Sequence, residues 1–144
     1  MIELVEDRLD IDTYLELRQS VQFRELTRDQ AKKGLSNSLY TLVAFKDGKA
    51  VGMGRIVGDG AIICYVQDLI IRPEVQGEGI GGLILETLKK FVIQEGYEGT
   101  TMMFDLMCAK GREEFYKKHG FIARPTKDLG PGMIQFIQIG SGEQ

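Results

Sequence analysis

The feature that most constrains the fold is a run of glycines between two regular segments. Gly77, Gly79, Gly81 and Gly82 fall within six residues, after a β-branched segment that ends at Pro73 and before an amphipathic stretch. Glycine at a helix-forming position costs about 1 kcal/mol relative to alanine, so the run needs a compensating reason. Free N–H groups at a helix N-terminus bind phosphate without a cationic side chain. The run therefore favours a turn that binds an anionic ligand over a turn that serves packing alone.

Hydrophobic spacing on both sides of the run predicts a strand, a helix and a second strand. Residues 61–71 are rich in β-branched side chains, and the apolar residues after the run recur at helical spacing as far as Gly96. Residues 100–107 form another apolar segment. Because the helix returns the chain across the sheet, we expect strands 61–71 and 100–107 to be parallel, with a right-handed crossover.

The residues before this unit predict an antiparallel meander. Residues 38–46 alternate in hydrophobicity, reach Asp47-Gly48 and resume over 49–57, which is typical of a β-hairpin. Gly52 and Gly54 inside this strand indicate a bulge or the close approach of a ligand. Further predicted elements are a strand over 2–5, helices over 11–21, 29–35 and 111–119, and a last strand over 133–139. The predicted fold class is α+β, with a mixed, mostly antiparallel sheet.

Composition excludes several classes of function. The 144 residues carry 18 basic and 21 acidic side chains, and a net charge of −3 argues against binding nucleic acid by neutralising its phosphates. Cys64 and Cys108 are far apart and His119 is the one histidine, which leaves little room for a metal site or a Ser-His-Asp triad. No apolar stretch approaches ~18 residues and no secretory signal is evident. We expect a single cytoplasmic domain over residues 1–144, with no metal and no membrane contact.

Two other phosphate-binding motifs come close to the glycine run. The run matches GxGxxG, but five residues separate it from the preceding strand, and about 40 residues follow Asp105. A dinucleotide-binding sheet has its turn directly after the strand and needs more chain than this. A P-loop requires Lys-Ser or Lys-Thr after the glycines, and neither occurs there. Both alternatives therefore fit less well.

Two boxes in order extend the pattern beyond the glycines. Gln76-Gly77-Glu78-Gly79-Ile80-Gly81 matches Q/R-x-x-G-x-G/A, and residues 115–121 read Phe-Tyr-Lys-Lys-His-Gly-Phe, which matches FYxxxGF. Together they resemble the acetyl-CoA motif and the second box of the GNAT superfamily of N-acetyltransferases, over about residues 38–123. The resemblance implies a GNAT fold, with helices on both faces of the sheet. Strands 61–71 and 100–107 would splay apart to admit CoA, and no metal is required.

The resemblance also implies which residues bind acetyl-CoA. By position, the main chain of Leu69, Ile70 and Ile71 would pair with the pantetheine arm. The pyrophosphate would lie on the loop residues Gln76, Gly77, Glu78, Gly79, Ile80, Gly81 and Gly82. Many family members have an asparagine before the second box, where this chain has Ala109-Lys110-Gly111-Arg112. Lys110 or Arg112 is therefore a candidate contact for the CoA phosphates.

The implied reaction is direct attack of an amine on the thioester in a ternary complex. It needs a base for the ammonium, a donor for the oxyanion and an acid for the thiolate. Tyr116 occupies the family's general-acid position, although packing of its ring is the alternative role. Asp68 and then Asp105 are the candidate bases, because a carboxylate in an apolar strand is costly unless it is used or paired. A salt bridge to an arginine is the alternative for each carboxylate.

The acceptor is the least constrained part of the prediction. A small-molecule amine is the first expectation, and residues 12–36 and 125–133 are expected to form the acceptor wall. A protein N-terminus or lysine is the second expectation. A non-catalytic acyl-CoA-binding sensor module is the alternative from another class. Family habit implies a homodimer formed through the last strand.

Overall fold

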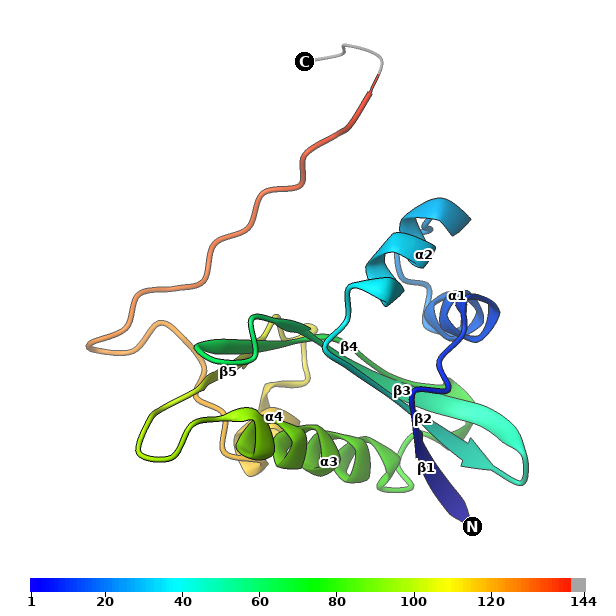
Figure 1. The fold of residues 1–144 in the computed structure, drawn as a ribbon, viewed down its shortest axis with the longest axis horizontal. Coiled ribbons are helices and arrows are strands. Elements are labelled where there is room, and N and C mark those ends of the chain that lie inside the picture. The colour runs from blue at the N-terminus through cyan, green and yellow to red at the C-terminus, as the bar shows by residue number, and fades with distance from the viewer. Residues whose placement is uncertain (141–144) are drawn as a thin grey trace. The chain divides into compact units, whose positions relative to one another are not determined.

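Five strands in sequence order form the sheet of the computed structural model, which describes residues 1–140 (Figure 1). The strands β1 (Ile2–Glu6), β2 (Tyr40–Lys46), β3 (Lys49–Gly58) and β4 (Ile63–Ile71) pair antiparallel with their neighbours, and β4 pairs in parallel with β5 (Met103–Leu106). This arrangement confirms the α+β class and the parallel pair predicted across the glycine run. The chain divides into two compact units, Met1–Cys108 and Ala109–Gln144, which are described separately.

Helices cover both faces of the sheet in the first unit (Figure 1). α1 (Ile11–Ser20) and α2 (Arg28–Ser36) lie on one face, and α3 (Ile80–Glu95) follows a short 3₁₀ turn, η1 (Pro73–Val75), and lies on the other. Asp10 caps α1 by accepting a hydrogen bond from the Thr13 amide at 2.8 Å, and Thr27 caps α2 in a capping box with Gln30. Both front helices are confirmed. Over residues 1–140, no helix is long and apolar enough to cross a membrane.

Each face of the sheet has its own apolar core. Beneath α3 the core contains Ile56 and Val66 from the strands and Ile84 and Leu88 from the helix, all buried. Against α1 and α2 a second core contains Tyr14, Leu17, Ala31, Met53 and Ile70. Because β3 and β4 contribute to both cores, their side chains are buried on alternating sides. This leaves the polar residues of β3 and β4 in apolar surroundings.

Gly52 and Gly54 lie where neighbouring atoms leave no room for a side chain on β3. A Cβ at Gly54 would lie 2.7 Å from Ile84 Cγ2 and 3.0 Å from Leu88 Cδ1. A Cβ at Gly52 would lie 2.8 Å from Ile71 Cδ1, and the pairing of β2 with β3 shifts register beside Gly52. A bulge is therefore present beside Gly52, and the close approach at Gly54 is that of the helix α3.

Replacing Gly54 with alanine should reduce the free energy of unfolding by about 1–3 kcal/mol, the usual cost of overpacking a core. The added methyl would force Ile84 and Leu88 away from the sheet. Urea denaturation followed by circular dichroism measures the change. Gly96→Ala is the matched control, since its φ is −67° and the nearest atom to its Cβ would be 3.7 Å away. Equal stability of the two variants would contradict the packing role.

Over its described residues, 109–140, the second unit contains one helix and a long extended segment. α4 (Glu113–Lys118) confirms the helix predicted before Gly120, although it is shorter. The strand predicted over 133–139 is wrong for the described chain, because this segment pairs with no other strand. A strand needs a hydrogen-bonded partner as well as β-forming residues. Its large apolar side chains are 63–88% exposed: Met133, Ile134, Phe136, Ile137 and Ile139.

Candidate active site

The turn between β4 and α3 holds its glycines in conformations that other residues rarely adopt. The φ of Gly77 is 87° and that of Gly79 is 85°. Gly79 is the N-cap of α3, and no side chain caps the helix. A Cβ at Gly77 or Gly79 would meet nothing within 4 Å. Uncapped amides beside open space are the arrangement that binds an oxyanion at a helix N-terminus.

Side chains from the loop itself hold this turn in place. The side-chain Nε2 of Gln76 donates a hydrogen bond to the Ile71 carbonyl at 3.0 Å, so this side chain braces the loop. Glu78 Oε1 accepts a hydrogen bond from Lys46 Nζ at 2.8 Å, and this contact raises the pKa of Lys46. Gln76 and Glu78 thus leave their main chain, rather than their side chains, for a bound phosphate.

β4 has no partner strand along the second half of one edge. β5 pairs with β4 only from Ile63 to Val66, whereas β3 follows β4 as far as Ile71. The register between β3 and β4 shifts after Arg55, which leaves Gln67 as a bulge. Within residues 1–140, the β5 side of Leu69–Ile71 therefore carries no ladder. An extended ligand with amide groups can bind such an edge as an added strand.

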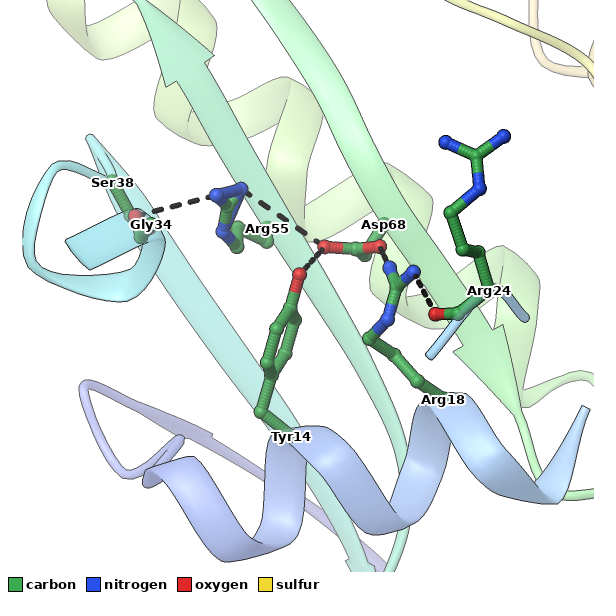
Figure 2. Close-up of polar contacts among 7 residues, drawn as sticks. All are labelled: Tyr14, Arg18, Arg24, Gly34, Ser38, Arg55 and Asp68. Carbon is green, nitrogen blue, oxygen red and sulfur yellow. Dashed lines mark hydrogen bonds and ion pairs between the residues drawn. The ribbon is translucent and has the colours of Figure 1, made fainter. Parts of the chain in front are cut away.

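Asp68 lies at the centre of a buried polar cluster (Figure 2). Its Oδ2 accepts a hydrogen bond from the Tyr14 hydroxyl at 2.7 Å, and its Oδ1 accepts one from Arg18 Nη1 at 3.0 Å. Arg55 Nη1 lies 4.0 Å from Oδ2, and Asp68 itself is 1% exposed. Burial and then the charge of Asp68 raise the pKa of Tyr14 to about 12, so this hydroxyl stays a donor. The salt bridge considered as the alternative role of Asp68 is therefore present.

Asp105, the other predicted carboxylate, lies on β5 opposite Tyr65 of β4. Its Oδ1 is buried and has no hydrogen-bond partner, and burial raises the pKa of the carboxyl group. Burial raises the pKa of Tyr65 first, and the charges of Asp105 and Asp68 raise it further. The negative charges of both carboxylates therefore act on the Tyr65 hydroxyl. Asp105 combines an unpartnered oxygen with a raised pKa, two properties that suit a general base.

Tyr116 and Lys110 belong to the second unit. Tyr116 lies on α4, and its ring packs edge-on against Phe115, with centroids 5.0 Å apart, and against Phe121, at 5.7 Å. Lys110 is exposed in the turn before α4. The packing role considered for Tyr116 is therefore observed within this unit, and its catalytic role stays a prediction.

Sequence reasoning missed the partners of Asp68. Tyr14 and Arg18 are four residues apart on α1, on the same face of the helix. Arg55 stands opposite Asp68 in the β3–β4 register. An arginine in the middle of an apolar strand was the available signal, by the same argument that singled out Asp68. In the part of the chain that the structure describes, no group of three His, Cys, Asp or Glu could hold a metal ion.

Comparison with known proteins agrees with this geometry. The family model for the acetyltransferase (GNAT) domain matches residues 37–123, more than half of the chain. A GNAT family acetyltransferase from Streptococcus pneumoniae is 29% identical, with a TM-score of 0.78 over 96% of this chain and 100% of that one. A probable acetyltransferase of unknown function from meticillin-resistant Staphylococcus aureus is 28% identical, with a TM-score of 0.83 over 95% of this chain and 100% of that one.

Curated relatives are longer than the part that matches. GCN5-related N-acetyltransferase 2 of Arabidopsis thaliana is 29% identical over 80 residues, which are 56% of this chain and 30% of that protein. An uncharacterized N-acetyltransferase of Pyropia yezoensis is 31% identical over 100 residues, 67% of this chain and 55% of that protein. The chain thus spans 30% of one of these relatives and 55% of the other. The family model matches more than half of the chain, and the mixed sheet and the glycine turn before α3 are consistent with that match. The chain therefore belongs to the GNAT family of acetyltransferases.

Proposed function

We propose that the protein transfers the acetyl group of acetyl-CoA to the primary amine of a small molecule, by direct attack in a ternary complex. The observation that carries this proposal is the juxtaposition of two backbone features on one stretch of chain. The unpaired edge at Leu69–Ile71 leads through η1 directly into the uncapped N-terminus of α3. One feature suits an extended amide-bearing arm and the other a diphosphate, and CoA has both.

Each part of the cosubstrate has a proposed contact. The main chain of Leu69, Ile70 and Ile71 would bind the pantetheine arm. The main chain from Gln76 to Gly82 would bind the pyrophosphate, where the open space at the glycines leaves room for it. Lys110 would bind a phosphate of CoA. Acetyl-CoA supplies an activated thioester, so the protein has only to position the amine and move protons.

The proposed reaction assigns the base to Asp105 and the acid to Tyr116. In this proposal the amine nitrogen bonds to the carbonyl carbon, the C–S bond breaks, and one amine proton leaves through Asp105. Tyr116 protonates the CoA thiolate, so the products are an amide and free CoA, and solvent returns a proton to Tyr116. The N–H of Ile70 or Ile71 would donate to the oxyanion. Asp68, the other candidate base, is assigned a positioning role because it is paired with Arg18.

A thiol-release assay tests the proposal. The protein is mixed with acetyl-CoA and a panel of small amines, peptides with free N-termini and lysine-containing peptides, and free CoA is measured. Amine-dependent release that is fastest with small amines supports the proposal. Preference for peptides supports a protein acetyltransferase instead. Thermal stabilisation by acetyl-CoA without release from any amine indicates a sensor module, and no stabilisation at all rejects CoA binding.

Tyr116→Phe should lower kcat by about 100-fold, within the usual contribution of a general acid. The phenylalanine keeps the ring contacts with Phe115 and Phe121 and removes only the hydroxyl. The KM for acetyl-CoA should not change. Tyr97→Phe is the matched control, because Tyr97 is an exposed tyrosine after the end of α3. If kcat of Tyr116→Phe equals that of the control, Tyr116 has only a packing role.

The homodimer implied by family habit stays a prediction. The segment from Met133 to Ile139 exposes most of its apolar side chains and lies outside the five-stranded sheet of the described residues. Exposed apolar surface of this kind favours burial against another chain. This supports a role for the segment in association.

A further inference from the structure

The buried cluster around Asp68 holds more positive than negative charge (Figure 2). Arg18 and Arg55 both face Asp68, at 3.0 Å and 4.0 Å, and their side chains are 11% and 8% exposed. Among the ion pairs of residues 1–140, no other carboxylate pairs with either arginine. Tyr14 donates to Asp68 and stays neutral. Two guanidinium groups and one carboxylate leave one positive charge without a counter-charge, and burying such a charge is costly.

Several donors of the same arginines are unused. Arg18 Nε, Arg55 Nε and Arg55 Nη1 are buried and have no hydrogen-bond partner. The other ends of the two guanidinium groups are fixed, since Arg18 Nη2 donates to the Arg24 carbonyl at 2.9 Å and Arg55 Nη2 donates to the Gly34 carbonyl at 3.3 Å. Buried donors in folded proteins almost always have an acceptor. Rigidly held donors that lack an acceptor within the protein are free to bind one from a ligand or a buried water.

The cluster also lies next to the proposed site of reaction. Asp68 directly precedes Leu69, where the proposed pantetheine edge begins, and its side chain points to the face covered by α1 and α2. The centroid of the Tyr14 ring lies 5.7 Å from Cζ of Arg18 and 5.7 Å from Cζ of Arg55, so this one ring contacts both guanidinium groups. Phe23, which is partly exposed, lies 5.4 Å from Arg18 and marks the side of the cluster nearest the surface.

Resting on the proposed function, we propose that the acceptor is an amine that also carries a carboxylate, and that Arg18 and Arg55 bind this carboxylate. A single negative charge balances the surplus in the cluster, whereas a phosphate dianion would exceed it. A neutral amine or an amino sugar would leave the buried donors unpaired, and a polyamine would add like charge. The two arginines are therefore specificity-determining residues, and Asp68 positions them.

Matched pairs of acceptors test this assignment on the unmodified protein. The α-amino acids, β-alanine and γ-aminobutyrate are each compared with their primary amides by kcat/KM for thiol release. We expect at least one acid to exceed its amide by about tenfold or more, the factor that 1.4 kcal/mol of differential binding gives. The proposal is overturned if every acid has the same kcat/KM as its amide. It is also overturned if the preference for phosphoethanolamine over ethanolamine is larger than the preference for any acid over its amide. If neutral amines release thiol as fast as the acids do, the proposed acetyl transfer stands and only the carboxylate site is rejected.

A variant separates recognition from stability. Arg55→Gln removes the surplus charge, so it should fold with nearly the thermal stability of the parent while the preference for acids over amides is lost through a raised KM. The KM for acetyl-CoA should not change. Lys49→Gln is the control, because Lys49 forms an exposed ion pair with Glu74 and lies outside the expected acceptor wall. A large loss of stability with an unchanged acid preference would show a structural role and overturn the proposal. Stabilisation of the protein–CoA complex by the acids alone, measured by thermal shift, checks the site without turnover.

Discussion

Replacing Asp68 with asparagine is expected to reduce the free energy of unfolding by about 3–5 kcal/mol, the cost of removing one partner from a buried ion pair. The substitution preserves shape and leaves oxygen and nitrogen atoms near Tyr14 and Arg18, so it removes mainly the negative charge. Arg18 and Arg55 would then be buried side by side with no counter-charge. Their repulsion would act on α1, β3 and β4 together, because the cluster joins these three elements.

The matched control for this variant is Asp12→Asn. Asp12 also pairs with an arginine, Arg28, at 2.7 Å, but its side chain is 83% exposed and its partner is exposed too. Exposed pairs contribute little, at most about 1 kcal/mol. Chemical denaturation of both variants measures the difference. A loss of less than about 1 kcal/mol for Asp68→Asn would mean that water reaches the cluster, and would remove the basis for a buried charge surplus.

Local signals in the sequence predicted most of the regular structure. Asp10 and Thr27 act as caps because their side chains accept hydrogen bonds from amides three residues ahead, and such contacts depend only on neighbouring residues. The hairpin at Asp47-Gly48 and the helix after Gly79 are local in the same sense. β4 begins at Ile63 rather than at residue 61 as predicted. The Asp59 carboxylate accepts hydrogen bonds from the amides of residues 61–63, and these contacts hold the chain in a turn before the strand.

Features that depend on distant partners could not be predicted in this way. The contacts of Asp68 come from Tyr14 and Arg18, which are 54 and 50 residues away in sequence. The narrow space above Gly54 depends on where α3 crosses the sheet. The segment 133–139 has the residues of a strand, but pairing requires an available edge, and residue type does not supply one. The position of the glycine turn before α3 was thus accessible from the sequence, and the contacts around Asp68 were not.

Replacing Gly79 with alanine is expected to weaken acetyl-CoA binding by about tenfold or more, equivalent to about 1.4 kcal/mol, while the fold loses only about 1–2 kcal/mol for a side chain at positive φ. Gly79 has φ 85°, and its Cβ would meet no protein atom within 4 Å. That open space is where the proposed diphosphate would lie, so the added methyl should oppose the ligand more than the fold.

The hairpin glycine Gly48 provides a close control for this variant. Its φ is 80° and a Cβ there would also meet nothing within 4 Å, so Gly48→Ala carries the same backbone strain away from α3. Calorimetric titration with CoA and urea denaturation should show equal losses of stability and a loss of affinity in Gly79→Ala alone. If both variants bind CoA as tightly as the parent, the uncapped turn does not hold the diphosphate. Since the Gln76 and Glu78 side chains are used within the loop and by Lys46, the main chain is the part of this loop left to bind the diphosphate.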